Sequence, residues 1–409
     1  MEKMTILIVT SGQPSANPRV VKEAIALDAA GHSVTVVFAP LSPWADRFDE
    51  ELFARTPGIK WIPAGYHPLR NPWLYKFARV RRKLYEWLAV HTSFLKAGEK
   101  AYILYAQELS AAAARIKADL YIGHNLGALP AAVKAARKWK TKCGFDAEDF
   151  HRGESAPSSL AYSLAAAIEN KNIPALDYMS AASPLIAEEY ESIFPGRKVL
   201  TINNVFSRKY LQHIQPHAMT GLHLFWFSQT VGPERGLETV IEAINSLGEG
   251  KIHLHLLGNC SDTYRAELTG KMSDPASLHF IGPVPQESIF EIASGFDIGL
   301  ATEVPYCRNR DICLTNKLFS YLLSGNAIIA SDTLGQKKFL AEHKDIGLLY
   351  RDGDAGDLAS CLKRLYEDRA LLEEFRGNSL ALADGMMNWE KESEKLISHI
   401  AGLLNEKRN

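Results

Sequence analysis

The stretch "TNKLFSYLLSGNAIIASD" at residues 315–332 predicts a helix that begins at Thr315 and an apolar strand that begins at Ala327. Lys317 is unusual there, because a cation in the first helical turn opposes the positive N-terminal end of the helix dipole. A lysine that extends into solvent is one explanation, and it costs little. The alternative explanation is an anion bound at this helix N-terminus. Features elsewhere in the sequence are needed to choose between these two explanations.

Apolar strand signals alternate with helical patterns on both sides of this stretch. In the second half, strands are predicted at 222–228, 252–258, 278–282, 297–302 and 347–350, with helices at 236–247, 357–368 and 388–404. In the first half, strands are predicted at 4–10, 33–39, 59–64, 118–124, 143–149 and 198–204. A helix with Asn17 as its cap and Pro18 in its first turn connects the first two strands.

This alternation predicts an α/β protein with two consecutive doubly wound, Rossmann-like domains. We expect an N-terminal domain at 1–206, a linker at 207–221, a second domain at 222–386 and a C-terminal helix at 387–409 that packs back on the N-terminal domain. Ligands of such sheets bind at the carboxyl ends of the strands, so the cleft between the domains is the expected site.

The composition argues against several classes of protein. The chain has 409 residues and a net charge of −1, which gives no indication of a nucleic-acid partner. No apolar run approaches the roughly 18 residues of a membrane span, and we expect no signal peptide. The five cysteines lack metal-ligand spacing, so we expect a cytoplasmic protein without a disulfide framework or a zinc site.

Two predicted helix N-termini in the second half carry a cation. One is Lys317; the other is Arg235 in "SQTVGPERGLETV", after a turn at Gly232 and Pro233. Helix N-termini bind phosphate, and a nearby cation adds a charge-assisted bond, so the pair suggests a diphosphate site. An ion pair of Arg235 with a neighbouring glutamate is the plainer alternative. No dinucleotide or P-loop glycine motif is present.

Polar residues also follow two predicted strands of the first half. His124 ends the strand at 118–124, where it would face the cleft and could titrate near neutrality; a histidine that caps the loop is equally compatible. "DAED" at 146–149 ends the strand predicted at 143–149 and resembles a metal-binding carboxylate pair, as does "DGD" at 352–354 in the second half. Local capping explains both better. We expect no metal site.

Residues 71–100 combine seven Lys or Arg and two Glu with interleaved aromatic residues. Such a helix can lie on an anionic membrane surface, although a partly buried helix with a solvated basic face has the same pattern.

Taken together, these segments resemble retaining glycosyltransferases of the GT-B fold, in the large family four. The resemblance is carried in order by "SANPRVVKEAIALDAAGHSVTVV", "DLYIGHNLGALPAAVKAA", "INNVF", "VGPERGLETVIEAI", "LHFIGPVPQESIFEIASGFDIGLA", the stretch at 315–332 and "NWEKESEKL". It covers nearly the whole chain.

The resemblance implies roles for particular residues. It places His124 in the active site and implies that Arg235 and Lys317 bind the donor's phosphates as electrostatic catalysts. The implied donor-binding residues are Ser228, Gln229, Gly232, Gly258, Val284, Thr315, Asn316 and Ser320, and those on the acceptor side are Asn17, Arg19 and Asp146.

The sequence departs from the family pattern at three positions. The Glu-x7-Glu pair is absent, since Ile312 and Ser320 occupy its places. Gln229 replaces the arginine that often ends the first strand of the second domain, and Ala327 replaces a proline. The absent glutamate pair and Gln229 reduce the number of expected contacts with the ribose and the phosphates of the donor.

The implied function is the transfer of a sugar from a nucleotide-diphosphate sugar to a glycan, lipid-linked or small-molecule acceptor, with retention and without metal or cofactor. The donor would bind the second domain and the acceptor the first, in the cytoplasm or in peripheral contact with the inner face of the membrane. Two alternatives stay open. One is a catalytically degenerate GT-B subunit that only binds, and the other is a nucleotide-sugar epimerase of the same fold.

Overall fold

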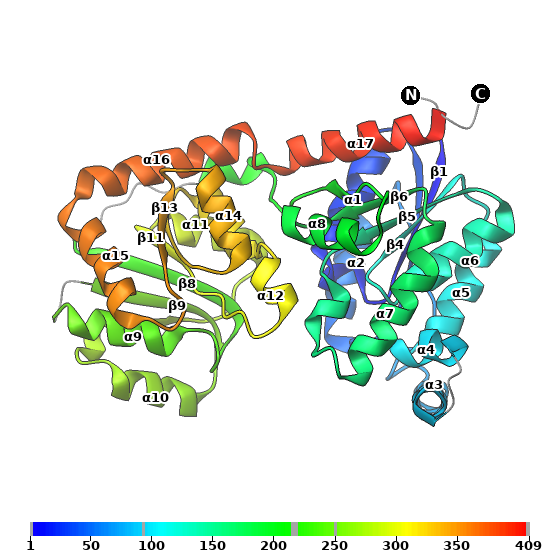
Figure 1. The fold of residues 1–409 in the computed structure, drawn as a ribbon, viewed down its shortest axis with the longest axis horizontal. Helices are drawn as coiled ribbons and strands as arrows, with labels where there is room; N and C mark the ends of the chain where they lie inside the picture. The colour runs from blue at the N-terminus through cyan, green and yellow to red at the C-terminus, as the bar shows by residue number, and fades with distance from the viewer. Residues whose placement is uncertain (1–2, 92–94, 214–219, 249–251, 406–409) are drawn as a thin grey trace. The chain divides into compact units, whose positions relative to one another are not determined.

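The structure is a computed structural model, and it describes residues 3–91, 95–213, 220–248 and 252–405. The chain forms two compact units (Figure 1). Unit 1 consists of residues 1–202, 307–309 and 393–409, and unit 2 of residues 203–306 and 310–392. Each unit is built around one parallel sheet, as the alternation of strand and helix signals predicts.

The sheet of unit 1 has the strand order β3-β2-β1-β4-β5-β6-β7. The chain therefore starts in the middle of the sheet, runs to one edge and then crosses to build the other half, as in doubly wound folds. Its strands are β1 (Thr5–Thr10), β2 (Ser33–Phe38), β3 (Lys60–Pro63), β4 (Leu120–His124), β5 (Lys142–Ala147), β6 (Tyr178–Ala181) and β7 (Leu200–Thr201).

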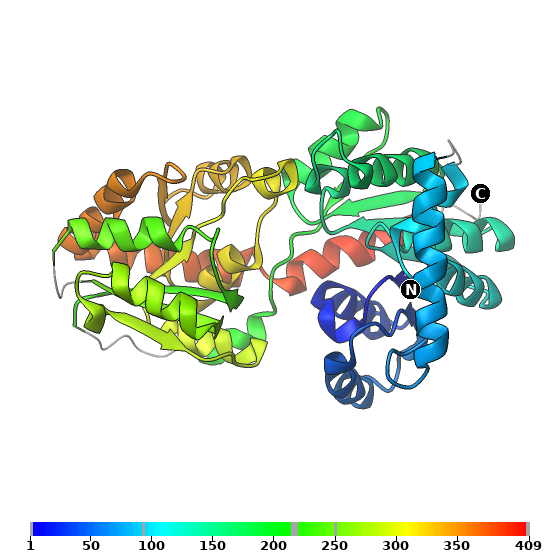
Figure 2. The ribbon, with the colours of Figure 1, turned by 90° about the horizontal axis from the view of Figure 1, so that it is seen from below.

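The first helix of unit 1 begins as its sequence predicts. The Asn17 side chain accepts hydrogen bonds from the backbone N–H groups of Arg19 and Val20, and Pro18 is the first helical residue. The helices are α1 (Pro18–Ala29), α2 (Asp46–Arg55), α3 (Pro72–His91), α4 (Leu95–Tyr102), α5 (Ala106–Arg115), α6 (Leu129–Trp139), α7 (Leu160–Asn172) and α8 (Pro184–Ile193). Figure 2 shows α3 lying across the near side of unit 1.

The sheet of unit 2 repeats the same pattern, in the order β10-β9-β8-β11-β12-β13. Its strands are β8 (Leu222–Val231), β9 (Ile252–Cys260), β10 (Leu278–Ile281), β11 (Ile298–Ala301), β12 (Ala327–Ser331) and β13 (Gly347–Tyr350). Its helices are α9 (Leu237–Ser246), α10 (Asp262–Lys271), α11 (Gln286–Ser294), α13 (Asn316–Ser324), α14 (Leu334–Glu342), α15 (Ala355–Glu367) and α16 (Arg369–Gly385). Two further helices have residues in both units, α12 (Arg308–Ile312) and α17 (Trp389–Asn405).

Successive residues of β8 point to opposite faces of its sheet. Trp226 belongs to a core cluster with side chains of α9, α10 and α15, whereas Phe225 belongs to a second cluster with side chains of α11 and α13. A helix layer on each face explains why the strand is apolar on both sides.

Three parts of the fold differ from the sequence expectation. Strand β6 lies in a stretch for which no strand was expected. Arg208–His213, in the expected linker, form a 3-10 helix whose Tyr210 ring stacks on Phe290 of unit 2 at 4.6 Å between ring centroids. Val205 and Phe206, placed in the first domain by the sequence, pack in the core of unit 2. Residues 214–219 lie outside the described residues.

Within the described part of the chain, the helices are all too short or too polar to cross a membrane.

Candidate functional site

The carboxyl ends of β8 and β11 in unit 2 are joined by a chain of hydrogen bonds. The Trp226 indole N–H donates to Thr302 Oγ1 at 3.0 Å, and the Thr302 hydroxyl donates to the Arg235 carbonyl at 2.8 Å. The turn at 232–236 is therefore fixed against the end of β11. Gly236 has φ of 74°, and a Cβ there would lie 3.1 Å from Thr302 Cβ, so this close approach needs a glycine.

Arg235 lies on this turn, directly before α9, and its side chain is exposed. Among the described residues, none forms an ion pair or hydrogen bond with its guanidinium. The plainer alternative from the sequence, an ion pair with a neighbouring glutamate, is not what the structure has: the Glu238 carboxylate instead accepts a bond from the Tyr264 hydroxyl at 2.6 Å. Arg235 is thus a solvent-facing cation at a strand end.

Lys317 lies at the same edge and has a partner from the protein. Its Nζ donates to Glu303 Oε1 at 2.7 Å and lies 5.3 Å from the centre of the Trp226 ring. The side chains of Lys317 and Glu303 are only 12% and 8% exposed. Thr315 Oγ1 donates to the same Glu303 oxygen at 3.0 Å, and an Arg310 nitrogen lies 3.7 Å from the other oxygen.

Glu303 explains why a cation lies in the first turn of α13. Burial alone would raise the pKa of this carboxyl, but the charge of Lys317 and its hydrogen bond outweigh burial and lower the pKa. An anion therefore does lie at the N-terminus of α13, where it complements the helix dipole, and it belongs to the protein. The sequence analysis missed Glu303 because it lies just beyond the strand predicted at 297–302.

The other expected donor-side residues divide into exposed and buried ones. Ser228 and Gln229 lie near the end of β8, beside the register shift between Phe227 and Thr230. Gly258 has φ of 146°, and a Cβ there would lie 2.2 Å from the Ser228 carbonyl oxygen, so no other residue fits. Gly232 is buried in the turn, and Val284 lies partly buried in the loop after β10.

The remaining donor-side positions lie on α13. Thr315 is its N-cap, although its hydroxyl bonds Glu303 and caps no backbone N–H. Asn316 Oδ1 accepts a bond from Asn204 at 2.9 Å. Ser320 is 2% exposed and lies on the buried part of the helix. Unlike Lys317, Ser320 is therefore closed to solvent.

His124 ends β4 at the carboxyl edge of unit 1 and is fully buried. Its Nε2 lies 2.9 Å from Glu23 Oε2, and its Nδ1 lies 3.3 Å from Glu148 Oε1 and 3.4 Å from Asp146 Oδ2. Burial would lower the pKa of His124, but the charge of Glu23 and bonds to Glu148 and Glu23 outweigh burial and raise the pKa to about 10. The expectation that His124 titrates near neutrality is wrong, because these carboxylates hold it as a fixed cation.

Arg19 and Asp146, both expected on the acceptor side, form a buried ion pair with each other. Arg19 Nε and Nη2 donate to the two Asp146 oxygens at 2.6 and 2.7 Å, and the side chains are 4% and 1% exposed. Arg19 also donates to the Ile202 carbonyl. Asn17 donates to Glu148 Oε1 at 2.6 Å. Glu148, whose side chain is 17% exposed, is the carboxylate of this cluster nearest to solvent.

Glu23, His124 and Asp146 bring one ligand atom each within 4.8 Å of one another, which is metal-ligand spacing. The donor set does not suit a cation, however. Both Asp146 oxygens already accept bonds from Arg19, and Ser180 donates to one of them at 2.6 Å. The Arg19 and His124 charges would also repel a metal ion.

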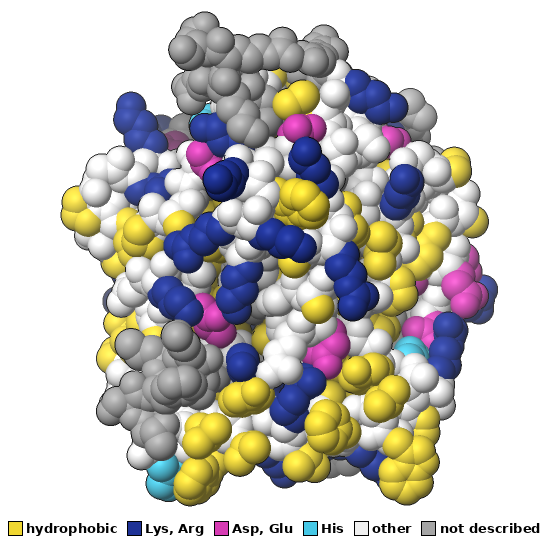
Figure 3. Space-filling view, turned by 90° about the vertical axis from the view of Figure 1, so that its right-hand side faces the viewer, with side chains coloured by type: hydrophobic (Ala, Val, Ile, Leu, Met, Phe, Trp, Pro, Cys, Tyr) yellow, Lys and Arg dark blue, Asp and Glu magenta, His cyan; other side chains and the backbone are white. Residues whose placement is uncertain are grey.

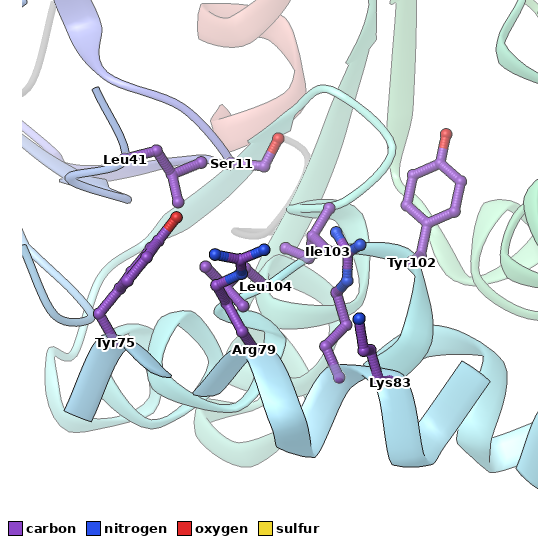
Figure 4. A pocket seen from close by; sticks show the side chains of 9 residues that line it. Ser11, Leu41, Tyr75, Arg79, Lys83, Tyr102, Ile103 and Leu104 are labelled. Carbon is purple, nitrogen blue, oxygen red and sulfur yellow. The ribbon is translucent and has the colours of Figure 1, made fainter. Parts of the chain in front are cut away.

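A cavity of about 340 Å³ opens near the end of β1 in unit 1. Arg79 and Lys83 of α3 line one side of it, and Ser11, which directly follows β1, lies opposite (Figure 4). Arg82 of α3 is a further lining residue. Arg82 Nε pairs with Glu86 at 3.1 Å, whereas Arg79 and Lys83 have no carboxylate partner in the described part of the chain. Tyr75 and Tyr102 also line the cavity, and its cations suit an anionic group.

Comparison with protein families gives two matches that follow each other along the chain. Residues 16–204 match the glycosyl transferase 4-like domain, and residues 222–368 match glycosyl transferases group 1. Curated protein sequences give no match.

Comparison with solved structures gives GT-B proteins over nearly the full chain. Sucrose-phosphate synthase from Thermosynechococcus elongatus has a TM-score of 0.72 at 15% identity, covering 99% of this chain and 100% of its own. Anabaena HepE in complex with UDP-glucose has 0.68 at 14%, covering 98% and 100%. A putative UDP-N-acetylglucosamine 2-epimerase from Listeria monocytogenes has 0.61 at 12%, covering 100% and 98%. At sequence identities this low, the similarity shows a shared fold and not a shared activity.

Proposed function

The chain belongs to the group 1 glycosyltransferases, and on that premise we propose that it moves a sugar from a nucleotide-diphosphate sugar to an acceptor held by unit 1. The transfer retains the anomeric configuration and uses no metal ion. The acceptor is a glycan, a lipid-linked sugar or a small molecule. The protein works in the cytoplasm.

The observation that carries the proposal is the pair of cations at one edge of unit 2. Glycosyl transfer builds negative charge on the leaving diphosphate while the sugar carbon becomes oxocarbenium-like. Arg235 is exposed and unpaired in the described part of the chain, so it can bind phosphate without breaking another contact. Lys317 is aimed by Glu303 and by the Trp226 ring. A preorganised cation such as Lys317 stabilises charge that develops in the transition state, and the exposed Arg235 adds a second positive charge at the same edge.

Glu303 has a positioning role in this proposal. Its carboxylate holds the Lys317 ammonium at the N-terminus of α13, and an ammonium has further donor positions for a phosphate oxygen. The negative charge of Glu303 also offsets part of the local positive charge, which helps the diphosphate to leave after transfer.

On the acceptor side, Glu148 rather than His124 is the group that can contact substrate. His124 is a buried cation whose Nδ1 lies 3.3 Å from Glu148 Oε1, and Asn17 and Asn125 donate to the Glu148 oxygens at 2.6 and 2.9 Å. We assign His124, Asn17, Arg19 and Asp146 to the network that positions Glu148. The cations of the cavity on α3 would then take an anionic part of the acceptor.

Incubation with a panel of UDP- and GDP-sugars tests the function. We expect turnover of one or more donors, starting with UDP-sugars because the HepE structure contains UDP-glucose. The anomeric coupling of the product by NMR tests retention, and undiminished activity after chelator treatment tests metal independence. Nucleotide stabilisation without any turnover would favour the degenerate subunit. An isomeric nucleotide sugar formed without acceptor would favour the epimerase.

A further inference from the structure

Helix α3 carries its apolar stripe on the outside of the protein. Trp73, Phe77, Val80, Leu84 and Trp87 follow one another at alternating spacings of four and three residues, which places them on one face of the helix. Their exposed fractions are 79%, 60%, 67%, 55% and 54%. An amphipathic helix of a globular protein normally turns such a stripe toward the core. Here the stripe faces solvent.

The opposite face of α3 is firmly attached to unit 1. Ala78 is fully buried, and the Tyr85 hydroxyl accepts a bond from Gln107 of α5 at 2.9 Å. Arg81 Nη2 donates to both oxygens of Glu108 at 2.8 and 2.7 Å. These contacts fix the rotation of the helix about its axis, so the outward direction of the stripe is built into the fold.

Cations accompany the stripe. Lys76, Arg79 and Lys83 are exposed on the side of the helix that borders it, and Lys76 Nζ lies 4.9 Å from the centre of the Trp73 ring. Glu86 is the single acidic residue of α3, and Arg82 pairs with it. Figure 3 shows the right-hand side of the molecule in Figure 1, and α3 lies along the lower edge of that view. Hydrophobic side chains line this lower edge, with Lys and Arg side chains beside them.

We propose that the outer face of α3 is a membrane-docking surface whose occupant is a bilayer containing anionic phospholipid. The apolar stripe enters the boundary between headgroups and acyl chains, and Lys76, Arg79 and Lys83 contact the headgroup phosphates. Trp73 and Trp87 lie near the two ends of the stripe, and such amphipathic rings favour the headgroup level. A second copy of the chain suits this face less well, since pairing would bring basic edges together without an opposite charge.

This inference goes beyond the proposed transferase function, because docking needs neither donor nor acceptor. It adds a consequence for the cavity near β1. Arg79 and Lys83 border both the docking surface and the cavity, so the cavity would open beside the headgroup layer. A membrane-borne acceptor would then reach unit 1 without leaving the bilayer.

Vesicle sedimentation of the full chain tests the proposal. We expect binding to phosphatidylcholine vesicles that contain phosphatidylglycerol, weaker binding to phosphatidylcholine alone, and a decrease with added salt. The double variant Phe77→Ser/Leu84→Ser should lose about tenfold or more of this binding, because it removes two side chains from the stripe. Phe48→Ser, which changes an exposed apolar residue of α2, is the matched control and should bind like the original protein.

Two results would overturn the docking surface. One is equal recovery of the original protein in the supernatant with both kinds of vesicle. The other is unchanged binding of the Phe77→Ser/Leu84→Ser variant. Dimerisation that this variant abolishes, without vesicle binding, would assign the face to a second copy. Turnover of a water-soluble donor should be the same in this variant, so failure of docking and failure of the transferase proposal are read separately.

Discussion

At the scale of single residues, Lys317 is a case in which an unusual position predicts the charge of its neighbour. Its position in the first turn of α13 indicates an anion, and the anion that the structure supplies is Glu303. The sequence could not name this partner, because Glu303 reaches the helix through strand order: β11 and β12 are neighbours in the sheet, and α13 connects them. Arg235 was predicted by the same argument, and the turn that carries it is held by the Thr302 hydroxyl at the end of β11.

The Lys317–Glu303 pair leads to a prediction about stability. Lys317→Met should destabilise the protein by about 3 kcal/mol, because it leaves a buried carboxylate without its main partner. The sequence alone predicts that stability stays nearly the same or rises slightly, because loss of Lys317 relieves an unfavourable dipole contact. Glu303→Gln combined with Lys317→Met should recover most of the loss, and urea unfolding of the four proteins gives the coupling energy. Additive losses would show that the pair is not coupled.

Arg235 leads to a contrasting prediction. Arg235→Ala should leave the unfolding free energy within about 0.5 kcal/mol of the original, since the side chain is exposed and has no ion-pair partner among the described residues. Loss of a charge-assisted phosphate bond should lower donor turnover about ten- to a hundredfold. Lys363→Ala, an exposed cation of α15 in the same unit, is the control. A normal rate in Arg235→Ala would remove this residue from the donor site.

At the scale of elements, the period of a sequence predicts a stripe but not the side to which it faces. The aromatic and basic pattern of residues 71–100 is compatible with a buried helix or a surface helix, and only the packing of α3 decides that the stripe faces out. Strand β6 was missed for a different reason. It has four residues, and "YMSA" contains no run of β-branched side chains. Its neighbours β5 and β7 fix it in the sheet.

Four histidines meet near the amino ends of β8, β9 and β10 and lead to a prediction about pH. The rings of His223 and His253 stack at 4.7 Å, and those of His255 and His279 at 4.4 Å. Burial, followed by the charges of His279 and other rings, lowers the pKa of His255 to about 3. Burial and neighbouring rings also lower the pKa of His253 and of His279.

These lowered pKa values mean that the unfolded chain binds more protons than the folded chain below the ordinary histidine pKa. The stability that these three histidines contribute should therefore be complete above about pH 6.5 and should fall as the pH decreases, with His255 contributing about 1.4 kcal/mol per pH unit. His255→Gln and His255→Phe should both flatten this dependence, measured by unfolding from about pH 5 to about pH 7.5. An equal slope in all three proteins would refute the assignment to His255.

At the scale of the whole molecule, the order of motifs along the chain is more informative than any one of them. The repeated alternation of strands and helices predicts two doubly wound sheets, and both have the order that starts in the middle and crosses once. Unit 1 includes residues 393–409, so its core is completed by side chains almost two hundred residues beyond its last strand.

The last prediction concerns α17, whose residues from 393 onward belong to unit 1. Leu396 and Ile400 are 1% and 0% exposed, and the His399 ring lies 5.5 Å from that of Tyr178 in β6. Leu396→Ala and Ile400→Ala should each destabilise unit 1 by about 2–5 kcal/mol, because each leaves a cavity in a packed core. Hydrogen exchange should then lose protection in β6 while β12 of unit 2 keeps it. Ser398→Ala, exposed on the same helix, should change neither strand. Protection lost first in β12 would mean that α17 supports unit 2 instead.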